Sequence, residues 1–163
     1  MRLFLVFCIL FIPSFALAES GANDIDMIVD EYMEAYKSFD VDRVETLISE
    51  DFDFHDPTSE ALPEPFITSG RDNVLRKWSA YRATVDEHRF IYEVERRFSY
   101  SGHVVLIGQA GWHVVADGQL SQSMMPIVTI ITVRDGMVVA HRDYVDYATG
   151  FAAATLTPVE NED

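Results

Sequence analysis

Apolar residues in the first half of the chain recur every three or four positions, which is the spacing of one face of a helix. The pattern predicts a first helix capped by Asp24, a second helix that begins after Asp40, and a third helix over residues 71–85. The apolar stripe of the first helix consists of Ile25, Ile28, Val29, Tyr32 and Tyr36.

After His88 the apolar residues alternate with polar ones, which predicts strands. The pairs Ser101-Gly102, Asp117-Gly118 and Asp135-Gly136 separate four such segments, and Asp-Gly favours hairpin turns because both positions tolerate positive φ. Helices followed by an antiparallel meander indicate an α+β domain. The predicted strands cover residues 51–56, 89–98, 103–115, 120–133 and 137–147.

Both faces of the strand over residues 120–133 are apolar. Ile127 and Ile131 lie on one face, whereas Val128 and Ile130 lie on the other. Three helices can cover only one face of the sheet, so we expect the other face to meet a second copy of the chain in a homodimer.

Residues 1–18 have the pattern of a signal peptide, with Arg2, an apolar run and the small-residue ending Ala16-Leu17-Ala18. The apolar run is too short to span a membrane, so we expect cleavage before Glu19 and no membrane attachment afterwards. The sequence therefore predicts an extracytoplasmic protein, either periplasmic or secreted.

The composition predicts one domain over residues 19–154 and a flexible acidic tail over residues 155–163. Cys8, the only cysteine, lies in the predicted signal peptide, so the domain depends on a packed core without a disulfide. The formal net charge is −15 and no cluster of Lys and Arg is present, which argues against a nucleic-acid partner.

Candidate chemistry is concentrated where the strand over residues 51–56 ends at Asp56-Pro57. Pro57 ends the strand, and a carboxylate held at a rigid strand terminus is a common setting for a catalytic or binding side chain. Asp before Pro is also ordinary turn chemistry, so both interpretations of Asp56 stand at this point.

The order of elements and three phrases resemble the nuclear transport factor 2-like superfamily, in its SnoaL-like branch. The resemblance covers about residues 24–151 and implies three N-terminal helices packed on a curved antiparallel sheet that forms a conical pocket. The phrases are Phe54-His55-Asp56-Pro57, Gly70-Arg71-Asp72-Asn73-Val74 and the segment Asp135 to Tyr144. The fold is shared by many activities, so the resemblance does not settle the reaction.

Within this superfamily the chain resembles ketosteroid isomerase, whose general base is the Asp of an Asp-Pro pair and whose oxyanion donor is a Tyr on the first helix. The resemblance implies Asp56 as base and Tyr32 as donor, and a bond between Tyr32 and Asp56 would satisfy the buried phenol. The isomerase has a second, carboxylic donor two residues after a late proline. Val128 stands at that position after Pro126 and can donate nothing.

Limonene epoxide hydrolase is a second comparison within the superfamily. Asp143 resembles one acid of its Asp-Arg-Asp site, and is therefore a third candidate catalytic residue. The other two positions fall near Gln109 and Gly111, which cannot supply the charged pair.

The ligand pocket is predicted to be lined by His55, Trp78, Trp112, Val128 and Ile130. His55 could relay a proton beside Asp56, although neighbouring strand residues point to opposite faces. His113 and His141 with Asp143 lack a recognised metal-ligand spacing, so we expect no metal, and no motif indicates a cofactor.

The sequence thus predicts a pocket protein in which Asp56 and Tyr32 handle protons on a small apolar carbonyl compound, in the manner of an isomerase or cyclase. A non-catalytic module that binds a small ligand or dimerises is the alternative, and Val128 favours it.

Overall fold

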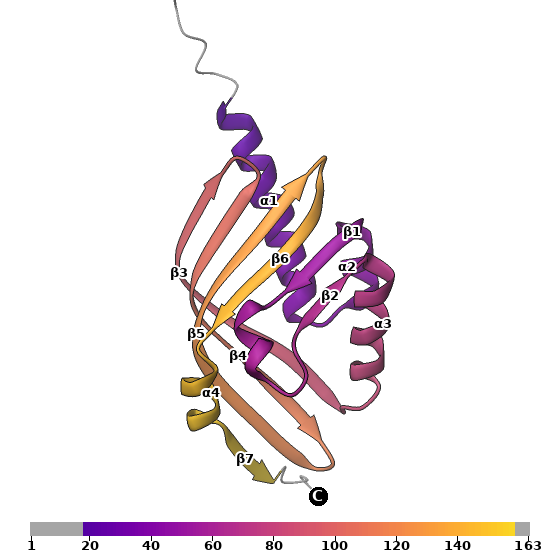
Figure 1. Cartoon of the computed structure of the whole chain (residues 1–163), viewed down its shortest axis with the longest axis vertical. Coiled ribbons are helices and arrows are strands. Elements are labelled where there is room, and N and C mark those ends of the chain that lie inside the picture. Colours follow the sequence, from indigo (N-terminus) through magenta and orange to yellow (C-terminus); the bar gives the residue numbers. More distant parts are fainter. Residues whose placement is uncertain (1–17, 159–163) are drawn as a thin grey trace, which may run out of the picture.

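The computed structural model describes residues 18–158, so most of the predicted signal peptide and residues 159–163 lie outside it. Figure 1 shows helices packed against a long, strongly bent sheet. The elements are α1 (Ala18–Lys37), α2 (Val41–Leu47), β1 (Ile48–His55), the 3-10 helix η2 (Pro57–Ala61), β2 (Ile67–Ser69), α3 (Arg71–Arg82), β3 (Glu87–Tyr100), β4 (His103–Ala116), β5 (Gln119–Arg134), β6 (Met137–Val145), α4 (Tyr147–Ala153) and β7 (Thr155–Pro158).

The seven-stranded sheet has the order β2-β1-β6-β5-β4-β3, and β7 pairs with β5 off this path. In Figure 1, α1 passes behind β5 and β6. We call the face of the sheet that contacts α1 the inner face and the opposite face the outer face. The predicted α+β class with helices on a curved sheet is confirmed. One pairing differs from an all-antiparallel sheet, since β1 joins β6 in parallel.

All three predicted hairpins are present, and each turn has two residues with positive φ. The register across β3, β4, β5 and β6 then fixes which side chains share a face. Phe90 lies opposite Trp112, Thr129 opposite Asp143, and Ile131 opposite His141, all on the inner face.

Two glycines of β4 allow the sheet to bend. A Cβ at Gly108 would lie 2.0 Å from the carbonyl oxygen of Glu93, beside the bulge between Val94 and Arg96. A Cβ at Gly111 would lie 1.8 Å from the carbonyl oxygen of Ser123. Only glycine permits backbones to approach this closely, so the curvature of the sheet depends on these positions.

The core lies between α1 and the inner face and is rich in aromatic rings. Tyr36 of α1 stacks on Phe90 at a centroid distance of 4.9 Å and also contacts Phe54, Trp78 and Tyr92. These side chains fill the concave interior of the sheet.

An ion cluster attaches α1 to β3. The Arg97 guanidinium donates to Asp26 Oδ1 over 2.8 Å and also pairs with Asp30, and the Ser99 hydroxyl donates to Asp26 over 2.5 Å. The Ser99 hydrogen bond lowers the pKa of the Asp26 carboxyl, burial opposes it, and the hydrogen bond and charge of Arg97 lower it further.

Several predicted boundaries are wrong. β1 begins at Ile48 and not at residue 51, and α3 ends at Arg82 and not at residue 85. α1 begins at Ala18, so Asp24 lies within the helix, because Ala and Glu residues before it favour helix formation. The last meander strand ends at Val145, and Asp146 then caps α4 by accepting from the Thr149 N–H. The predicted flexible tail begins too early, since residues 155–158 form β7 and pair with Gln119–Gln122 of β5.

Candidate functional site

A chain of hydrogen bonds runs through the buried interior from α1 to β5. The Tyr32 hydroxyl lies 2.8 Å from His141 Nδ1, and His141 Nε2 lies 3.0 Å from Asp143 Oδ1. The Thr129 hydroxyl donates to the same carboxylate oxygen over 2.5 Å. A carboxylate accepts only, so the His141 proton is assigned to Nε2, and Nδ1 accepts from Tyr32.

Burial keeps the phenol of this chain protonated. Tyr32 and His141 are fully buried, and 5% of Asp143 is exposed. Burial raises the pKa of Tyr32 well above its ordinary value, and the negative charge of Asp143 raises it further. Tyr32 therefore acts as a donor that fixes the orientation and tautomer of His141.

Asp143 is held by one oxygen only. Oδ1 accepts from Thr129 and His141, whereas Oδ2 makes no hydrogen bond to any residue between 18 and 158. The His141 ring, which bonds to Asp143, is itself packed among aromatic rings. Its centroid lies 4.8 Å from that of Tyr36 and 4.9 Å from that of Phe54. The Oδ2 oxygen is therefore an available acceptor on a carboxylate that is fixed in place, as a general base requires.

Asp56 lies at the end of β1, where it caps η2. Its Oδ1 accepts from the backbone N–H groups of Thr58 and Ser59 over 2.9 and 3.1 Å and from the Thr58 hydroxyl. Its Oδ2 accepts from the Tyr147 hydroxyl of α4. The turn interpretation of Asp56-Pro57 is thus present in the structure, and both carboxylate oxygens are occupied.

The phenol of Tyr147 is held by its hydrogen bond to Asp56. Burial raises its pKa above the ordinary value, and the hydrogen bond to Asp56 and the charges of Asp56 and Asp143 raise it further. Tyr147 therefore remains a protonated donor.

The structure separates two residues that the sequence suggested as partners. Tyr32 bonds to His141, not to Asp56, because β6 places His141 beside α1 while Asp56 lies at the far end of β1. The sequence-based interpretation also missed the roles of Thr129, His141 and Tyr147. The available signal was the spacing of His141 and Asp143, which places both on one face of a strand.

The predicted pocket residues divide between the two faces. Trp78 packs against Tyr36 in the interior, and Trp112 lies on the inner face with its indole N–H bonded to Ser121. Val128 and Ile130 alternate with the inward Thr129 and lie on the outer face, so their prediction as pocket residues is wrong.

His55 also points to the outer face, where its Nε2 lies 3.8 Å from Glu60, so its assignment to the pocket is wrong as well. His113 lies on the outer face and His141 on the inner face, so the two histidines do not converge. Gln109 and Gly111 likewise alternate with the inward residues of β4, away from Asp143.

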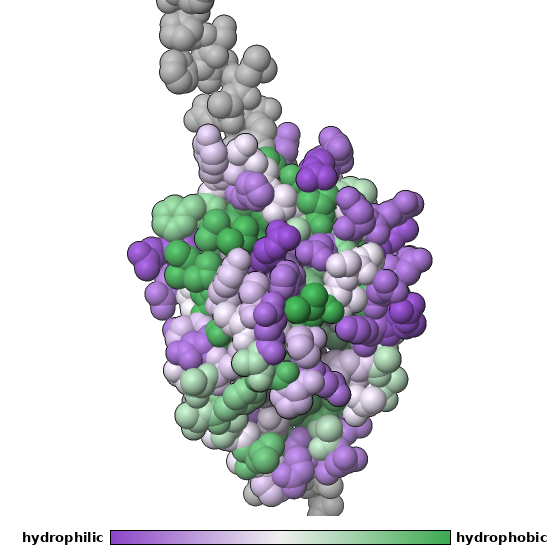
Figure 2. Space-filling model, in the orientation of Figure 1, coloured by the Kyte–Doolittle hydropathy of each residue, from purple (hydrophilic) through white to green (hydrophobic). Residues whose placement is uncertain are grey.

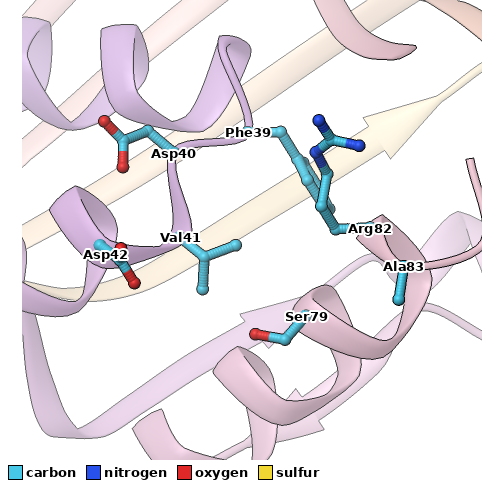
Figure 3. Close-up of a pocket in the computed structure, with 7 residues that line it drawn as sticks. All are labelled: Phe39, Asp40, Val41, Asp42, Ser79, Arg82 and Ala83. Carbon is cyan, nitrogen blue, oxygen red and sulfur yellow. The ribbon is translucent and has the colours of Figure 1, made fainter. Parts of the chain in front are cut away.

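A groove of about 390 Å³ lies outside this interior, between the start of α2 and the end of α3 (Figure 3). Its charged side chains have structural contacts, since Asp40 caps α2 through the Arg43 N–H and Arg82 donates to the Val85 carbonyl. The groove is lined by Phe39, Asp40, Val41, Asp42, Ser79, Arg82 and Ala83.

The inward hydrogen-bond chain, the bent sheet and the covering helices define a nuclear transport factor 2-like fold. Residues 29–141 match the SnoaL-like domain family, so this chain belongs to that family. Asp143 and Tyr147 lie beyond the matched residues. No curated protein matches the chain.

Solved structures show the same fold at low identity. A proposed SnoaL-like polyketide cyclase from Shewanella putrefaciens is 22% identical, with a TM-score of 0.62 over 88% of this chain and 94% of that one. A nuclear transport factor 2-like protein from Burkholderia xenovorans is 18% identical, with a TM-score of 0.61 over 82% and 98%.

An LEH-like epoxide hydrolase from M. tuberculosis is 15% identical, with a TM-score of 0.61 over 82% of this chain and 90% of that one.

Among residues 18–158, no helix is long and apolar enough to cross a membrane.

Proposed function

We propose that this protein is an acid-base catalyst of the isomerase or cyclase type, acting on a small apolar carbonyl compound, with Asp143 as the proton acceptor. The supporting observation is the buried carboxylate whose Oδ1 is held by Thr129 and His141 while Oδ2 is free. This assignment moves the base from Asp56, whose oxygens are occupied, to Asp143.

In the proposed reaction, Asp143 Oδ2 removes a proton from the carbon next to the carbonyl group. The C–H bond breaks, its electron pair forms the enolate, and the proton on Asp143 returns to another carbon. His141 and Thr129 keep the carboxylate in place, and Tyr32 keeps His141 in the tautomer that donates to Asp143. Positioned general-base catalysis contributes about 100- to 10,000-fold.

The proposal is tested by incubating the protein in D₂O with a panel of apolar ketones and enones and following α-deuteration by NMR. We expect deuteration of at least one compound, lost in Asp143→Asn. Asp53→Asn is the matched control, because Asp53 pairs with Arg142 on the outer face. Deuteration that survives in Asp143→Asn would overturn the assignment of the base.

One observation favours a non-catalytic binding module instead. Aromatic side chains fill the concave interior, and the groove between α2 and α3 lies outside it. This alternative predicts that the protein binds a small ligand, or associates with a second copy, without any proton exchange.

We also propose that the protein acts outside the cytoplasm as a homodimer. The extracytoplasmic location rests on the signal-peptide pattern of residues 1–18. The dimer rests on the outer face, where Phe98 lies opposite Val105 and Val105 opposite Ile130. Figure 2 shows hydrophobic side chains gathered over the upper parts of β3 and β4. A second copy on this face would remove apolar surface from water.

A further inference from the structure

α4 covers Asp56 at the end of β1 and is attached to the rest of the molecule by few side-chain contacts. The Ser123 hydroxyl donates to the Gly150 carbonyl over 2.6 Å, and a Cβ at Gly150 would meet the Met125 sulfur at 2.6 Å. The Tyr147 hydroxyl is bonded to Asp56. Ala148, Thr149, Phe151 and Ala152 are exposed, and Phe151 has 56% of its surface exposed.

The surroundings of Tyr147 have the composition of a ligand site. The acceptor is Asp56, a carboxylate that is 2% exposed, and the ring lies between Phe151 at 5.7 Å and Phe66 at 6.4 Å. Asp143 is close enough for its charge to act on the phenol. Phe151 belongs to α4 itself, so Phe66 is the aromatic contact from outside this helix. A buried anionic acceptor beside an aromatic ring is suited to an aromatic or conjugated ring that carries an acidic hydroxyl.

We propose that Tyr147 is a built-in occupant of a site for phenolic or enolic ligands, in which Asp56 accepts the ligand hydroxyl and α4 is displaced. A ligand hydroxyl in the position of the Tyr147 hydroxyl keeps the hydrogen bond to Asp56, so the buried carboxylate is not left unpaired during the exchange. The ligand ring then replaces the Tyr147 ring against Phe66.

The inference deepens the proposed function and rests on it for its meaning, because an enol is the hydroxyl-bearing tautomer of the kind of carbonyl compound on which the proposed reaction acts. The site itself can be tested without that reaction. Binding of a phenol without α-deuteration of any ketone would keep this site and overturn the proposed chemistry.

The test uses residues 19–163 with 4-methylphenol and, as a matched compound without an O–H donor, 4-methylanisole. Amide hydrogen exchange by NMR reports α4 through the Gly150 N–H, which is bonded to the Asp146 carbonyl. We expect 4-methylphenol to speed exchange at Gly150 at least several-fold while amides of β6 stay protected, and 4-methylanisole to have no such effect. Equal effects of both compounds, or none, would overturn the proposal.

Two variants test whether the Tyr147 hydroxyl competes with a ligand hydroxyl for Asp56 or only packs α4 against the sheet. Tyr147→Phe removes the competing hydroxyl, so we expect 4-methylphenol to bind about tenfold more tightly than to the wild type. Asp56→Asn replaces the anionic acceptor by a neutral one and should weaken binding about tenfold. Tyr144→Phe, on the outer face, is the control and should bind like the wild type. Unchanged affinity in both test variants would contradict the site.

Discussion

At the scale of single residues, the arrangement of side chains in the interior is determined by buried polar groups that form hydrogen bonds with one another. Thr129, His141 and Asp143 come from adjacent strands and meet Tyr32 of α1 where water is excluded. A buried polar group without a partner costs more than the hydrogen bond itself contributes. The network therefore fixes the position of α1 on the sheet as well as the orientation of the proposed base.

The variant Tyr32→Phe tests the free-energy cost of leaving a buried polar group without its hydrogen-bond partner. The variant leaves His141 Nδ1 buried without a donor, so we expect the free energy of unfolding in urea to fall by about 1–3 kcal/mol. Tyr144→Phe removes a hydroxyl from a half-exposed ring on the outer face and should change stability by less than about 0.5 kcal/mol. Equal stability of the two variants would show that the hydrogen bond to His141 does not hold α1.

His88 gives the protein a predictable dependence on pH. Its ring stacks on Phe39 at 4.5 Å, and neither ring nitrogen has a hydrogen-bond partner among residues 18–158. Burial, with a smaller effect of the Arg82 charge, lowers the pKa of His88 to about 4. The folded value lies below the unfolded value of about 6.5, so protonation favours unfolding and stability is lost as pH falls from about 6.5 to 4.

The variant His88→Phe keeps the ring stack and removes the titration. We expect its stability advantage over the wild type to grow by about 2 kcal/mol between pH 7 and pH 4, since one pKa unit corresponds to about 1.4 kcal/mol and partial exposure reduces the total. The measurement is thermal or urea unfolding at both pH values. A constant difference between the two proteins would contradict a lowered pKa.

At the scale of elements, alternation and turn chemistry predicted the meander well, because Asp-Gly pairs fix hairpins locally. They did not predict α4, which is only seven residues long and contains a glycine, Gly150. This position must be glycine because a side chain there would meet Met125. The pairing of Tyr32 with His141 joins residues far apart in sequence, so neither spacing nor composition could indicate it. The inward positions of His141 and Asp143, by contrast, follow from alternation alone.

Gly108 tests how the sheet is bent. A methyl group there would meet the Glu93 backbone at 2.0 Å, so Gly108→Ala should cost about 2–3 kcal/mol in urea unfolding. Gly118→Ala meets nothing within 4 Å and strains only a turn with φ of +69°, so it should cost about 1 kcal/mol. If Gly108→Ala cost no more than Gly118→Ala, close approach at the bulge would not set the curvature.

At the scale of the whole molecule, one face of the sheet is covered by helices and the other keeps an apolar surface. Apolar residues on both faces of β5 indicated this division from the sequence, although the sequence could not say which face held the ligand. Val128 and Ile130 prove to belong to the outer face. These two residues therefore belong to the surface of the proposed dimer contact and not to the candidate functional site.

Sedimentation of Val128→Asp tests the dimer. A charge on the outer face should convert a dimer of the wild type into a monomer, because a buried unpaired carboxylate costs several kcal/mol. Asp53→Asn, away from the apolar rows of the outer face, should sediment as the wild type does. A wild type that sediments as a monomer at micromolar concentration would contradict the proposal.

The most direct test of the central claim compares three carboxylates in one experiment. The rate of α-deuteration of a responsive ketone in D₂O is measured for wild type, Asp143→Asn, Asp56→Asn and Asp53→Asn, each shown to be folded. We predict that Asp143→Asn lowers the rate at least 100-fold, while Asp53→Asn leaves it unchanged and Asp56→Asn lowers it less than Asp143→Asn does. A loss of exchange in Asp56→Asn with full activity in Asp143→Asn would contradict the account and return the base to Asp56.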